Sequence, residues 1–337
     1  MGIKYLLITG SFPPDVCGVG DYVSRLYDSA DKDSWEVYYS SNWHLTNIRT
    51  IISEIKKINP KYAIIQYPTQ GYGWSLVPHL LCMYLRFFSK IKVYVMLHEF
   101  SKRKLKSKIA TMLFALTKNI LFTTAFEKKE WQKLHLRCKR NHIPIRANIP
   151  VCPVQKKWDE REYDLIYFGL ISPNKGIEDF ITVINELQNP NLKVAIIGMV
   201  PELSQGYLKI IKSNILGKGI QLILNKSDNE VAKILANSRI AFLPFPDGVS
   251  ERRGSYLACM GNGNLIITYK GKETADYMLK TALFVTQNSA SGIISRTLSE
   301  FDNKQYLLYQ NKVRDYLRKY VPNTWNDVVK LYEINID

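Results

Sequence analysis

The sequence predicts an α/β protein divided into two parallel-sheet domains. Short runs rich in β-branched and aromatic residues alternate with longer stretches of helical spacing, and the alternation continues through both halves of the chain. The length of 337 residues is about twice that of an average domain. Between the halves, residues 144–154 (PIRANIPVCPV) are broken by prolines and lack periodicity, as expected of a linker.

In the first half, each expected strand ends at a loop that leads toward a helix. The expected strands are 4–10, 35–41, 62–68, 92–98 and 120–125, and the expected helices are 21–30, 46–59, 76–88 and 107–119. Right-handed crossovers bring the carboxyl ends of parallel strands to one edge of the sheet, where ligands bind.

The second half repeats the same alternation. The expected strands are 163–169, 192–199, 220–225, 240–246 and 264–269, and the expected helices are 177–189, 203–216, 229–238 and one that begins near 254, followed by terminal helices over 304–335. We therefore expect an N-terminal domain over residues 1–152, a second domain over 153–316 and a helical segment over 317–337.

The composition excludes several classes of protein. An apolar fraction of 46% is too high for a disordered chain. The five cysteines are scattered without a C-x-x-C pair, which favours reduced thiols over a disulfide framework or a zinc site. The apolar run at residues 5–9 is too short for a signal-peptide core, and no stretch approaches the ~20 apolar residues of a spanning helix. We therefore expect a cytoplasmic protein.

The formal net charge of +16 is concentrated in one region. Residues 80–146 contain 16 Lys and Arg but only three acidic residues, Glu99, Glu127 and Glu130. A basic region of this kind suggests a polyanionic partner: nucleic acid, an anionic membrane surface or a phosphorylated substrate.

A glycine-rich loop follows the first strand and opens the next helix. It runs from Gly10 to Asp21 with Gly18 and Gly20, and it matches neither a Walker loop nor G-x-G-x-x-G. Amides at such a helix start can take a phosphate; a tight turn with Asp21 as N-cap is the alternative interpretation. His98 ends the strand at 92–98, where it either faces a ligand or is buried against the backbone.

Two loops in the second half place basic residues between a strand and a helix. Lys175-Gly176 follow a strand that ends at Gly169, and a lysine at a helix N-terminus can neutralise a diphosphate. Residues 244–255 (PFPDGVSERRGS) place two arginines before a helix that Ser255 can cap. Guanidinium groups and helix-end amides suit a diphosphate. Exposed surface loops are the alternative interpretation of both segments.

Taken together, these motifs resemble GT4-like glycosyltransferases of the GT-B fold, the glycosyl transferases group 1 family. The resemblance lies in the glycine-rich first loop, QYPTQGYG (66–73), LHEFS (97–101), FGLISPNKG (168–176), PFPDGVSERRGS, ACMGNG (258–263) and LIIT (265–268). It implies two Rossmann-like domains facing across a cleft, with a C-terminal helix packing back on the N-terminal domain. It also implies a nucleotide-diphosphate sugar on the second domain, a glycan acceptor on the first, retention of the anomeric configuration, and no cofactor or metal.

The resemblance also assigns roles to individual residues. Catalytic roles fall to His98, Lys175 and Arg253. Donor contacts fall to Gly18, Gly20, Gly169, Lys175, Asp247, Arg252, Arg253, Gly254 and Ser255, and acceptor contacts to Tyr67, Tyr72 and His98. The sequence departs from the family pattern at Leu170, where many members have Arg, and at Ser250 and Ala258, which occupy the positions of the usual glutamate pair; Glu251 lies beside the first.

The basic region then belongs to the acceptor-side domain. We expect Lys102, Arg103, Lys104, Lys106 and Lys108 to dock the protein on an anionic membrane that carries a lipid-linked glycan acceptor. The expected function is hexosyl transfer in bacterial surface-polysaccharide assembly (O-antigen, capsule or exopolysaccharide). The alternatives are a nucleotide-sugar-binding protein without transferase activity and a nucleic-acid-binding protein. The chain lacks the G-x-G-x-x-G loop of a nicotinamide-dependent oxidoreductase and a nucleic-acid-binding motif, so neither nicotinamide nor nucleic acid is an expected partner.

Overall fold

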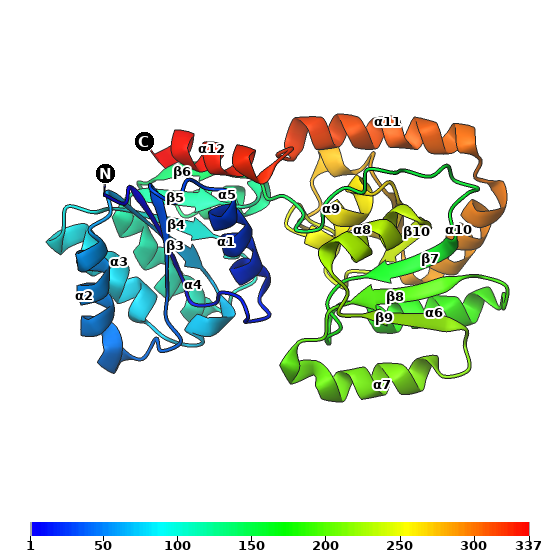
Figure 1. Ribbon diagram of the computed structural model, residues 1–337, viewed down its shortest axis with the longest axis horizontal. Helices are drawn as coiled ribbons and strands as arrows, with labels where there is room; N and C mark the ends of the chain where they lie inside the picture. Colours follow the sequence, from blue (N-terminus) through cyan, green and yellow to red (C-terminus); the bar gives the residue numbers. More distant parts are fainter. Residues whose placement is uncertain (1, 337) are drawn as a thin grey trace. The chain divides into compact units, whose positions relative to one another are not determined.

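The computed structural model describes residues 2–336, and the chain forms two compact units (Figure 1). Unit 1 comprises Met1–Ile145 and Pro322–Asp337, and unit 2 comprises Arg146–Val321. Each unit contains one six-stranded sheet, and the pairings between its strands are parallel. The predicted α/β class with two parallel sheets is confirmed, and the first division between the units lies within the segment expected to be a linker.

The sheet of unit 1 has the strand order β2-β1-β3-β4-β5-β6. The strands are β1 (Tyr5–Thr9), β2 (Trp35–Tyr39), β3 (Tyr62–Tyr67), β4 (Lys92–Leu97), β5 (Asn119–Phe122) and β6 (Lys139–His142). Connections from β1 to β2 and from β2 to β3 run in opposite directions along the sheet, so β1 and β3 flank the point at which the strand order reverses.

Helices cover both faces of this sheet. They are α1 (Gly18–Asp28), α2 (Ile48–Ile58), α3 (Val77–Phe88), α4 (Leu105–Met112), α5 (Ala125–Gln132) and α12 (Trp325–Ile336), with the short 3-10 helices η1 (Leu45–Asn47), η2 (Gln70–Tyr72) and η3 (Leu113–Thr117). Because side chains alternate along a strand, Leu6 and Ile8 pack with α2, α3 and η3, whereas Tyr5 and Leu7 pack with α1 and α12. Burial on both faces explains the continuous apolar runs in the strands.

The C-terminal helix α12 belongs to unit 1, although 176 residues of unit 2 precede it in the chain. Val328, Tyr332 and Ile336 are buried in the core between the sheet and α1. The Tyr94 hydroxyl of β4 donates a hydrogen bond of 2.7 Å to the carbonyl oxygen of Ile336. The prediction that the terminal helix packs back on the N-terminal domain is confirmed (Figure 1).

The sheet of unit 2 has the strand order β12-β11-β10-β7-β8-β9. The strands are β7 (Tyr163–Phe168), β8 (Val194–Gly198), β9 (Ile220–Leu224), β10 (Ser238–Leu243), β11 (Leu265–Tyr269) and β12 (Leu283–Val285). Counted within the unit, this is the doubly wound order 6-5-4-1-2-3, which reverses between β7 and β10.

Some helices of unit 2 begin at a capping box that the sequence provides. The helices of this unit are α6 (Ile177–Leu187), α7 (Gln205–Ile215), α8 (Asp228–Ala236), α9 (Gly254–Gly261), α10 (Gln287–Glu300) and α11 (Asn303–Tyr320), with η4 (Glu202–Ser204) and η5 (Asp276–Met278). Ser227 and Glu230 form a capping box at α8, and Asp302 and Gln305 form one at α11.

Several elements differ from the sequence-based expectation. The strands β6 and β12 were not predicted, because four and three residues are too few to show a period-2 pattern. The expected helix at 107–119 begins earlier and tightens into η3 at Leu113. The helical tail contains α11 and α12, which end and begin on either side of Pro322. Within residues 2–336, no helix combines the length and the apolar character needed to span a bilayer.

Candidate functional site

The candidate site of unit 2 lies where its strand order reverses. β7 and β10 are neighbours, with Leu165 opposite Ile240 and Ile166 opposite Ala241. Their helical connections leave toward opposite ends of the sheet, so the loops after both strands meet at its carboxyl edge. These two loops, residues 169–176 and 244–253, contain Lys175 and Arg253.

The two loops are packed against each other so closely that glycine is required. Gly176 has φ +85°, and a Cβ atom there would lie 2.0 Å from the carbonyl oxygen of Pro244. A Cβ at Gly198, which ends β8, would lie 1.9 Å from the carbonyl oxygen of Gly169. The two loops are therefore in direct backbone contact at Gly176 and Pro244.

Lys175 and its neighbours form the start of α6. The Tyr167 hydroxyl, buried under the loop, donates a hydrogen bond of 3.1 Å to the carbonyl oxygen of Lys175. Burial raises the pKa of Tyr167, which keeps this hydroxyl protonated and able to donate. Lys175 is half-buried, and it lies two residues before Ile177, the first residue of α6. Lys175 therefore lies just before the N-terminus of α6, which is the positive end of the helix dipole.

Arg253 occupies the N-cap position of α9. Its guanidinium group forms an ion pair with Asp247, and its Cζ atom lies 4.7 Å from the centre of the Phe245 ring. The buried Nε atom has no hydrogen-bond partner in the described structure. A Cβ added at Gly254 would meet nothing within 4 Å, so the start of the helix is open at that point. Ser255 lies inside the first turn, and the expectation that it caps the helix is wrong.

Two residues just before Arg253 make polar contacts within unit 2. Arg252 forms an ion pair of 3.3 Å with the buried carboxylate of Glu273, and Glu251 accepts a hydrogen bond from the Tyr277 hydroxyl. Ser250 is buried, and its hydroxyl has no partner in the described structure. The pairing with Glu273 gives Arg252 a structural role that the sequence alone did not reveal, because Glu273 is 21 residues away.

Sequence reasoning missed Tyr167, Gly176 and Glu273 as supports of these loops. For Gly176 a signal was present, because a glycine between a strand and a helix often marks a left-handed backbone. Tyr167 and Glu273 gave no such signal, because their roles arise from contacts between segments distant in the chain.

Unit 1 has a second switch point, between β1 and β3. A Cβ at Gly71 would lie 1.6 Å from the carbonyl oxygen of Gly10, and the Gly71 N–H donates a 2.7 Å hydrogen bond to the Ser11 hydroxyl. The loops after β1 and β3 are therefore in contact. At the start of α1, a Cβ at Gly20 would lie 3.0 Å from the carbonyl oxygen of Ser11, whereas Gly18 faces open space.

The N-cap of α1 is Cys17, so the alternative interpretation of Asp21 as N-cap is wrong. Asp21 lies in the first turn, and burial raises its pKa against the opposing influence of Arg25. The predicted helix over 21–30 therefore begins three residues earlier, at Gly18.

His98 lies at the end of β4, next to β3, and is held by a chain of polar side chains. Its Nε2 atom is 2.9 Å from the Oε1 atom of Gln66, which is fully buried. The Gln66 amide donates a 3.5 Å hydrogen bond to the Tyr332 hydroxyl of α12, and the Tyr22 hydroxyl of α1 donates to the same oxygen at 3.2 Å. The Tyr22 ring also meets His98 edge to face at 5.4 Å. His98 is thus oriented by β3, α1 and α12 together.

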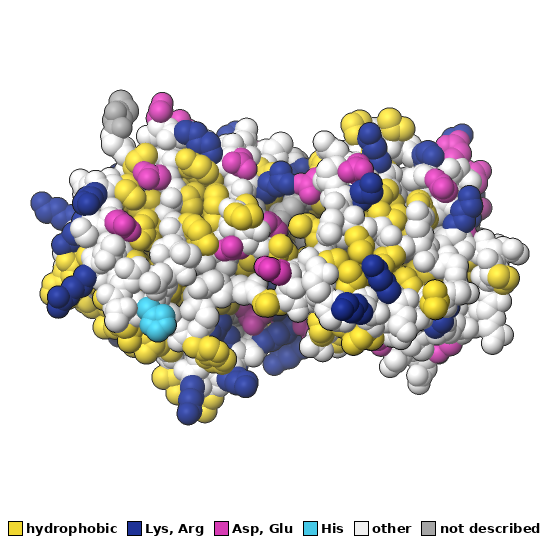
Figure 2. All heavy atoms as spheres, turned by 60° about the horizontal axis from the view of Figure 1, so that its bottom comes forward, with side chains coloured by type: hydrophobic (Ala, Val, Ile, Leu, Met, Phe, Trp, Pro, Cys, Tyr) yellow, Lys and Arg dark blue, Asp and Glu magenta, His cyan; other side chains and the backbone are white. Residues whose placement is uncertain are grey.

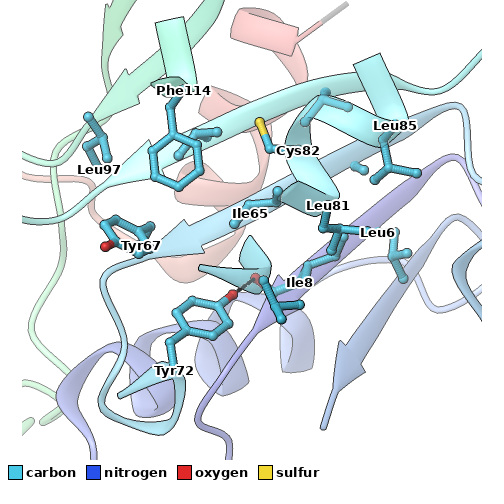
Figure 3. Close-up of a cluster of buried hydrophobic side chains, with 14 of the residues drawn as sticks. Leu6, Ile8, Ile65, Tyr67, Tyr72, Leu81, Cys82, Leu85, Leu97 and Phe114 are labelled. Atoms are coloured by element: carbon cyan, nitrogen blue, oxygen red, sulfur yellow. Dashed lines mark hydrogen bonds between the residues drawn. The ribbon is translucent and has the colours of Figure 1, made fainter. Parts of the chain in front are cut away.

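Tyr67 and Tyr72 are mostly buried in the core of unit 1 (Figure 3). The Tyr72 hydroxyl donates a 3.2 Å hydrogen bond to the carbonyl oxygen of Ile8, and the Tyr67 hydroxyl accepts one of 2.9 Å from Arg103. Tyr72 is 3% exposed and Tyr67 is 5% exposed, so both rings pack inside the unit. Their assignment to the acceptor stays a prediction.

The five basic residues expected to dock on a membrane fall into two groups. Lys102, Lys104 and Lys106 are exposed. Arg103 is half-buried, with Nε donating to the Ser107 hydroxyl at 2.6 Å and Cζ 4.8 Å from the Tyr67 ring centre. Lys108 is half-buried, with its ammonium 5.8 Å from the Phe100 ring centre. Arg103 and Lys108 thus make contacts inside unit 1.

Comparison with protein-family models decides which family these loops belong to. Residues 151–255 match the model described as Glycosyl transferases group 1, a span that contains both the Lys175 loop and the Arg253 loop. The second half of the chain, over residues 151–255, therefore matches the glycosyl transferases group 1 family. This match agrees with the resemblance drawn from the motifs. No curated protein matches the chain in sequence.

Solved structures share the fold of this chain over almost its whole length. Sucrose-phosphate synthase of Thermosynechococcus elongatus matches with a TM-score of 0.71 at 13% identity, covering 98% of each chain. A glycosyltransferase of Rickettsia africae ESF-5 matches with a TM-score of 0.70 at 13% identity, covering 99% of this chain and 98% of its own. HepE of Anabaena, solved with UDP and glucose, matches with a TM-score of 0.71 at 11% identity and 99% coverage of both chains. The predicted GT-B fold is confirmed.

Within residues 2–336, no three His, Cys, Asp or Glu side chains are grouped so that they could hold a metal ion. In unit 2, Lys175 and Arg253 lie just before the starts of α6 and α9. In unit 1, Gln66 and Tyr22 contact His98.

Proposed function

We propose that this protein is a retaining glycosyltransferase that moves a hexosyl group from a nucleoside-diphosphate sugar to a glycan acceptor. The observation that carries the proposal is the contact between the Lys175 loop and the Arg253 loop at the switch point of unit 2. In doubly wound sheets, ligands bind at this position.

The chemistry of the two loops suits a diphosphate leaving group. As the glycosidic bond to the donor breaks, negative charge grows on the diphosphate, and fixed cations and amides stabilise it. Lys175 at the start of α6 and Arg253 at the start of α9 provide both. Asp247 and Phe245 hold the guanidinium group of Arg253 in place. The proposed mechanism requires no resident metal ion or cofactor.

The identity of the donor class is supported by proteins with the same fold. HepE was solved with UDP and glucose, and TarM of S. aureus, which has a TM-score of 0.64 to this chain, was solved with UDP. We therefore propose a nucleoside diphosphate as the group that unit 2 binds, with Gly169 and Gly254 as points where the backbone can approach it.

For unit 1 we propose the acceptor. His98 directly follows β4, the neighbour of the switch-point strand β3, and the Gln66 side chain of β3 orients it. We propose a lipid-linked glycan as the acceptor, in bacterial surface-polysaccharide assembly, with the protein bound to the inner face of the plasma membrane. The excess of basic residues in 80–146 supports this part of the proposal.

Hydrolysis of the donor sugar in the absence of acceptor tests the proposal. UDP-sugars and GDP-sugars are incubated with the protein, and the released sugar is followed by proton NMR, which also reports its anomeric configuration. We expect slow release with retained configuration, reduced about 100-fold or more by Lys175→Ala. The control is Lys209→Ala, which removes an exposed lysine of α7. Inversion would contradict the retaining mechanism.

A second candidate function is nucleotide-sugar binding without transfer. It is favoured by Ser250 and Ala258, which stand where the family usually has glutamates, and by Glu251, which is engaged with Tyr277. Binding of a nucleotide sugar by the unaltered protein, without release of the sugar and without its transfer to an acceptor, would establish this alternative and reject the first.

A further inference from the structure

Two neighbouring helical segments of unit 1 expose large apolar side chains. One segment is the loop before α3 together with α3; the other is α4 with η3. We define the apolar face as their exposed apolar residues: Trp74, Leu76, Leu80, Phe87, Phe88, Leu105, Ile109, Leu113 and Leu116. Trp74 is 90% exposed, and Phe88 and Leu105 are each 73% exposed. Such exposure of a tryptophan, a phenylalanine and a leucine leaves apolar area in water that a partner would cover.

The spacing of these residues shows that each segment has a core side and an outer side. In α3, Leu81, Cys82 and Leu85 point into the core (Figure 3), whereas Leu80, Phe87 and Phe88 are exposed. Along the second segment, Leu105, Ile109, Leu113 and Leu116 follow one another at intervals of three or four residues, which is helical spacing.

The two segments pack against each other at their buried sides. The Phe114 ring of η3 stacks on the His79 ring of α3, with ring centres 4.4 Å apart and planes 12° apart. Burial, followed by the charge of Arg103, lowers the pKa of His79 to about 4. This neutral histidine is therefore part of the packing between the segments, and the apolar face spans two joined elements.

The surroundings of the apolar face are basic. Arg86 and Lys90 lie at the end of α3, and Lys102, Lys104 and Lys106 lie at the start of α4; all five are exposed. Figure 2 shows apolar and basic side chains side by side along the lower edge of unit 1, on the left. At the start of α4, Leu105 lies directly between the exposed Lys104 and Lys106 in the sequence.

None of the three acidic residues of this region is fully exposed. Glu127 is fully buried and accepts hydrogen bonds from the backbone N–H groups of Phe100 and Ser101. Glu130 is half-buried and paired with Lys133 at 2.5 Å, and Glu99 is half-buried. Residues 80–146 therefore present exposed positive charge without an exposed carboxylate among them.

We propose that the apolar face lies in the headgroup region of an anionic lipid bilayer, with Trp74, Phe88 and Leu105 inserted and Lys102, Lys104 and Lys106 on lipid phosphates. A bilayer offers apolar area and anionic charge together. Aromatic side chains favour the membrane interface, and each Lys near an anionic surface adds about 1 kcal/mol. The inference rests on the proposed function and deepens it. It adds an apolar surface that inserts into the bilayer to the expected electrostatic docking.

Vesicle flotation tests the inference directly. The full chain is mixed with vesicles of phosphatidylcholine alone or of phosphatidylcholine with phosphatidylglycerol. We expect binding to the anionic vesicles that persists in part at high salt, because the inserted side chains are not screened. The triple variant Trp74→Ser, Phe88→Ser, Leu105→Ser should bind at least about tenfold more weakly, since it removes three apolar groups from the bilayer.

A matched triple variant controls for the loss of apolar surface itself. Leu203→Ser, Ile210→Ser and Leu216→Ser remove exposed apolar residues around α7 of unit 2, where Leu203 is 89% exposed and Leu216 is 82% exposed. This variant should bind vesicles like the unaltered protein. The variant Lys102→Glu, Lys104→Glu, Lys106→Glu should lose the preference for anionic lipid.

Brominated lipids provide a second readout, because they quench tryptophan fluorescence only at contact depth. Quenching in the unaltered protein should disappear in Trp74→Phe. Equal flotation of the two triple variants, or no preference for anionic vesicles, would overturn the inference. So would dimerisation in light scattering that the first triple variant abolishes, since a second copy would then cover the face. Nucleoside-diphosphate binding by these variants, measured in parallel, reports separately on the proposed function.

Discussion

Arg253 combines three features that suit the proposed diphosphate site. Asp247 binds its guanidinium group, Phe245 lies under it, and its own backbone caps α9. A guanidinium group that is already oriented loses less side-chain entropy when an anion binds. The neighbouring Arg252 has the same chemistry, but its pairing with the buried Glu273 makes it a support of the loop.

His98 offers a different kind of residue-level test, because Gln66 joins it to the Tyr332 hydroxyl of α12. Tyr332→Phe removes the hydroxyl that accepts from Gln66 and leaves the ring in the core. We expect the transfer rate to fall about tenfold, with donor KM unchanged, because a less well-oriented histidine acts on the acceptor and not on the donor. Steady-state kinetics with saturating acceptor measure both parameters.

The matched control is Tyr94→Phe, which also removes a buried tyrosine hydroxyl that contacts α12, at Ile336, but has no hydrogen bond to Gln66. If both variants slowed transfer equally, anchoring of α12 would explain the effect and the orienting role of Tyr332 would be rejected.

Single residues also show where sequence reasoning reached its limit. Lys175 and Arg253 could be proposed because a basic residue before a helix has a local meaning. The burial of Tyr72 and the pairing of Arg252 with Glu273 could not, because they depend on contacts between distant segments. Ser255 was expected to cap α9 but lies two residues after the N-cap, Arg253. Helix ends are the least certain feature of a sequence pattern.

At the scale of elements, the strands with long apolar runs were predictable. β1, β3, β4, β7, β8, β10 and β11 lie within or close to the expected ranges, because burial on both faces of a parallel sheet leaves continuous apolar sequence. The edge strand β6 has the sequence KRNH, which carries no apolar signal, and it was missed. The strand order was not predicted, because pairing between distant strands leaves no local pattern.

The two switch-point loops act as one element, and Gly176 tests this directly. Gly176→Ala forces a side chain into a left-handed backbone position and toward the carbonyl oxygen of Pro244. We expect unit 2 to lose about 1–3 kcal/mol of stability and nucleoside-diphosphate binding to weaken, because both loops must shift. Urea unfolding and calorimetry measure the two effects.

The control for this variant is Gly206→Ala in α7, where a Cβ meets nothing within 4 Å. This change should be neutral or stabilise the helix by about 0.5–1 kcal/mol. Equal stability of the two alanine variants would contradict the tight contact between the loops.

At the scale of the whole molecule, the chain joins two parallel sheets of different strand order. Unit 2 has the doubly wound order with one central reversal, and its loops carry the cations. Unit 1 has the order 2-1-3-4-5-6, carries the histidine, and is completed by a helix from the far end of the chain. The motif order along the sequence predicted this two-part architecture. The return of α12 into the first core was predictable only through the family resemblance.

The central claim is that unit 2 binds a nucleoside diphosphate through Arg253, and calorimetric titration of the full chain with UDP and GDP tests it most directly. We predict a single site for at least one of the two nucleotides, with affinity reduced about tenfold or more in Arg253→Ala. Arg296→Ala, which removes an exposed arginine paired with Glu300 on α10, should leave the affinity unchanged. Absence of binding to both nucleotides, or equal binding by Arg253→Ala and the unaltered protein, would contradict the account.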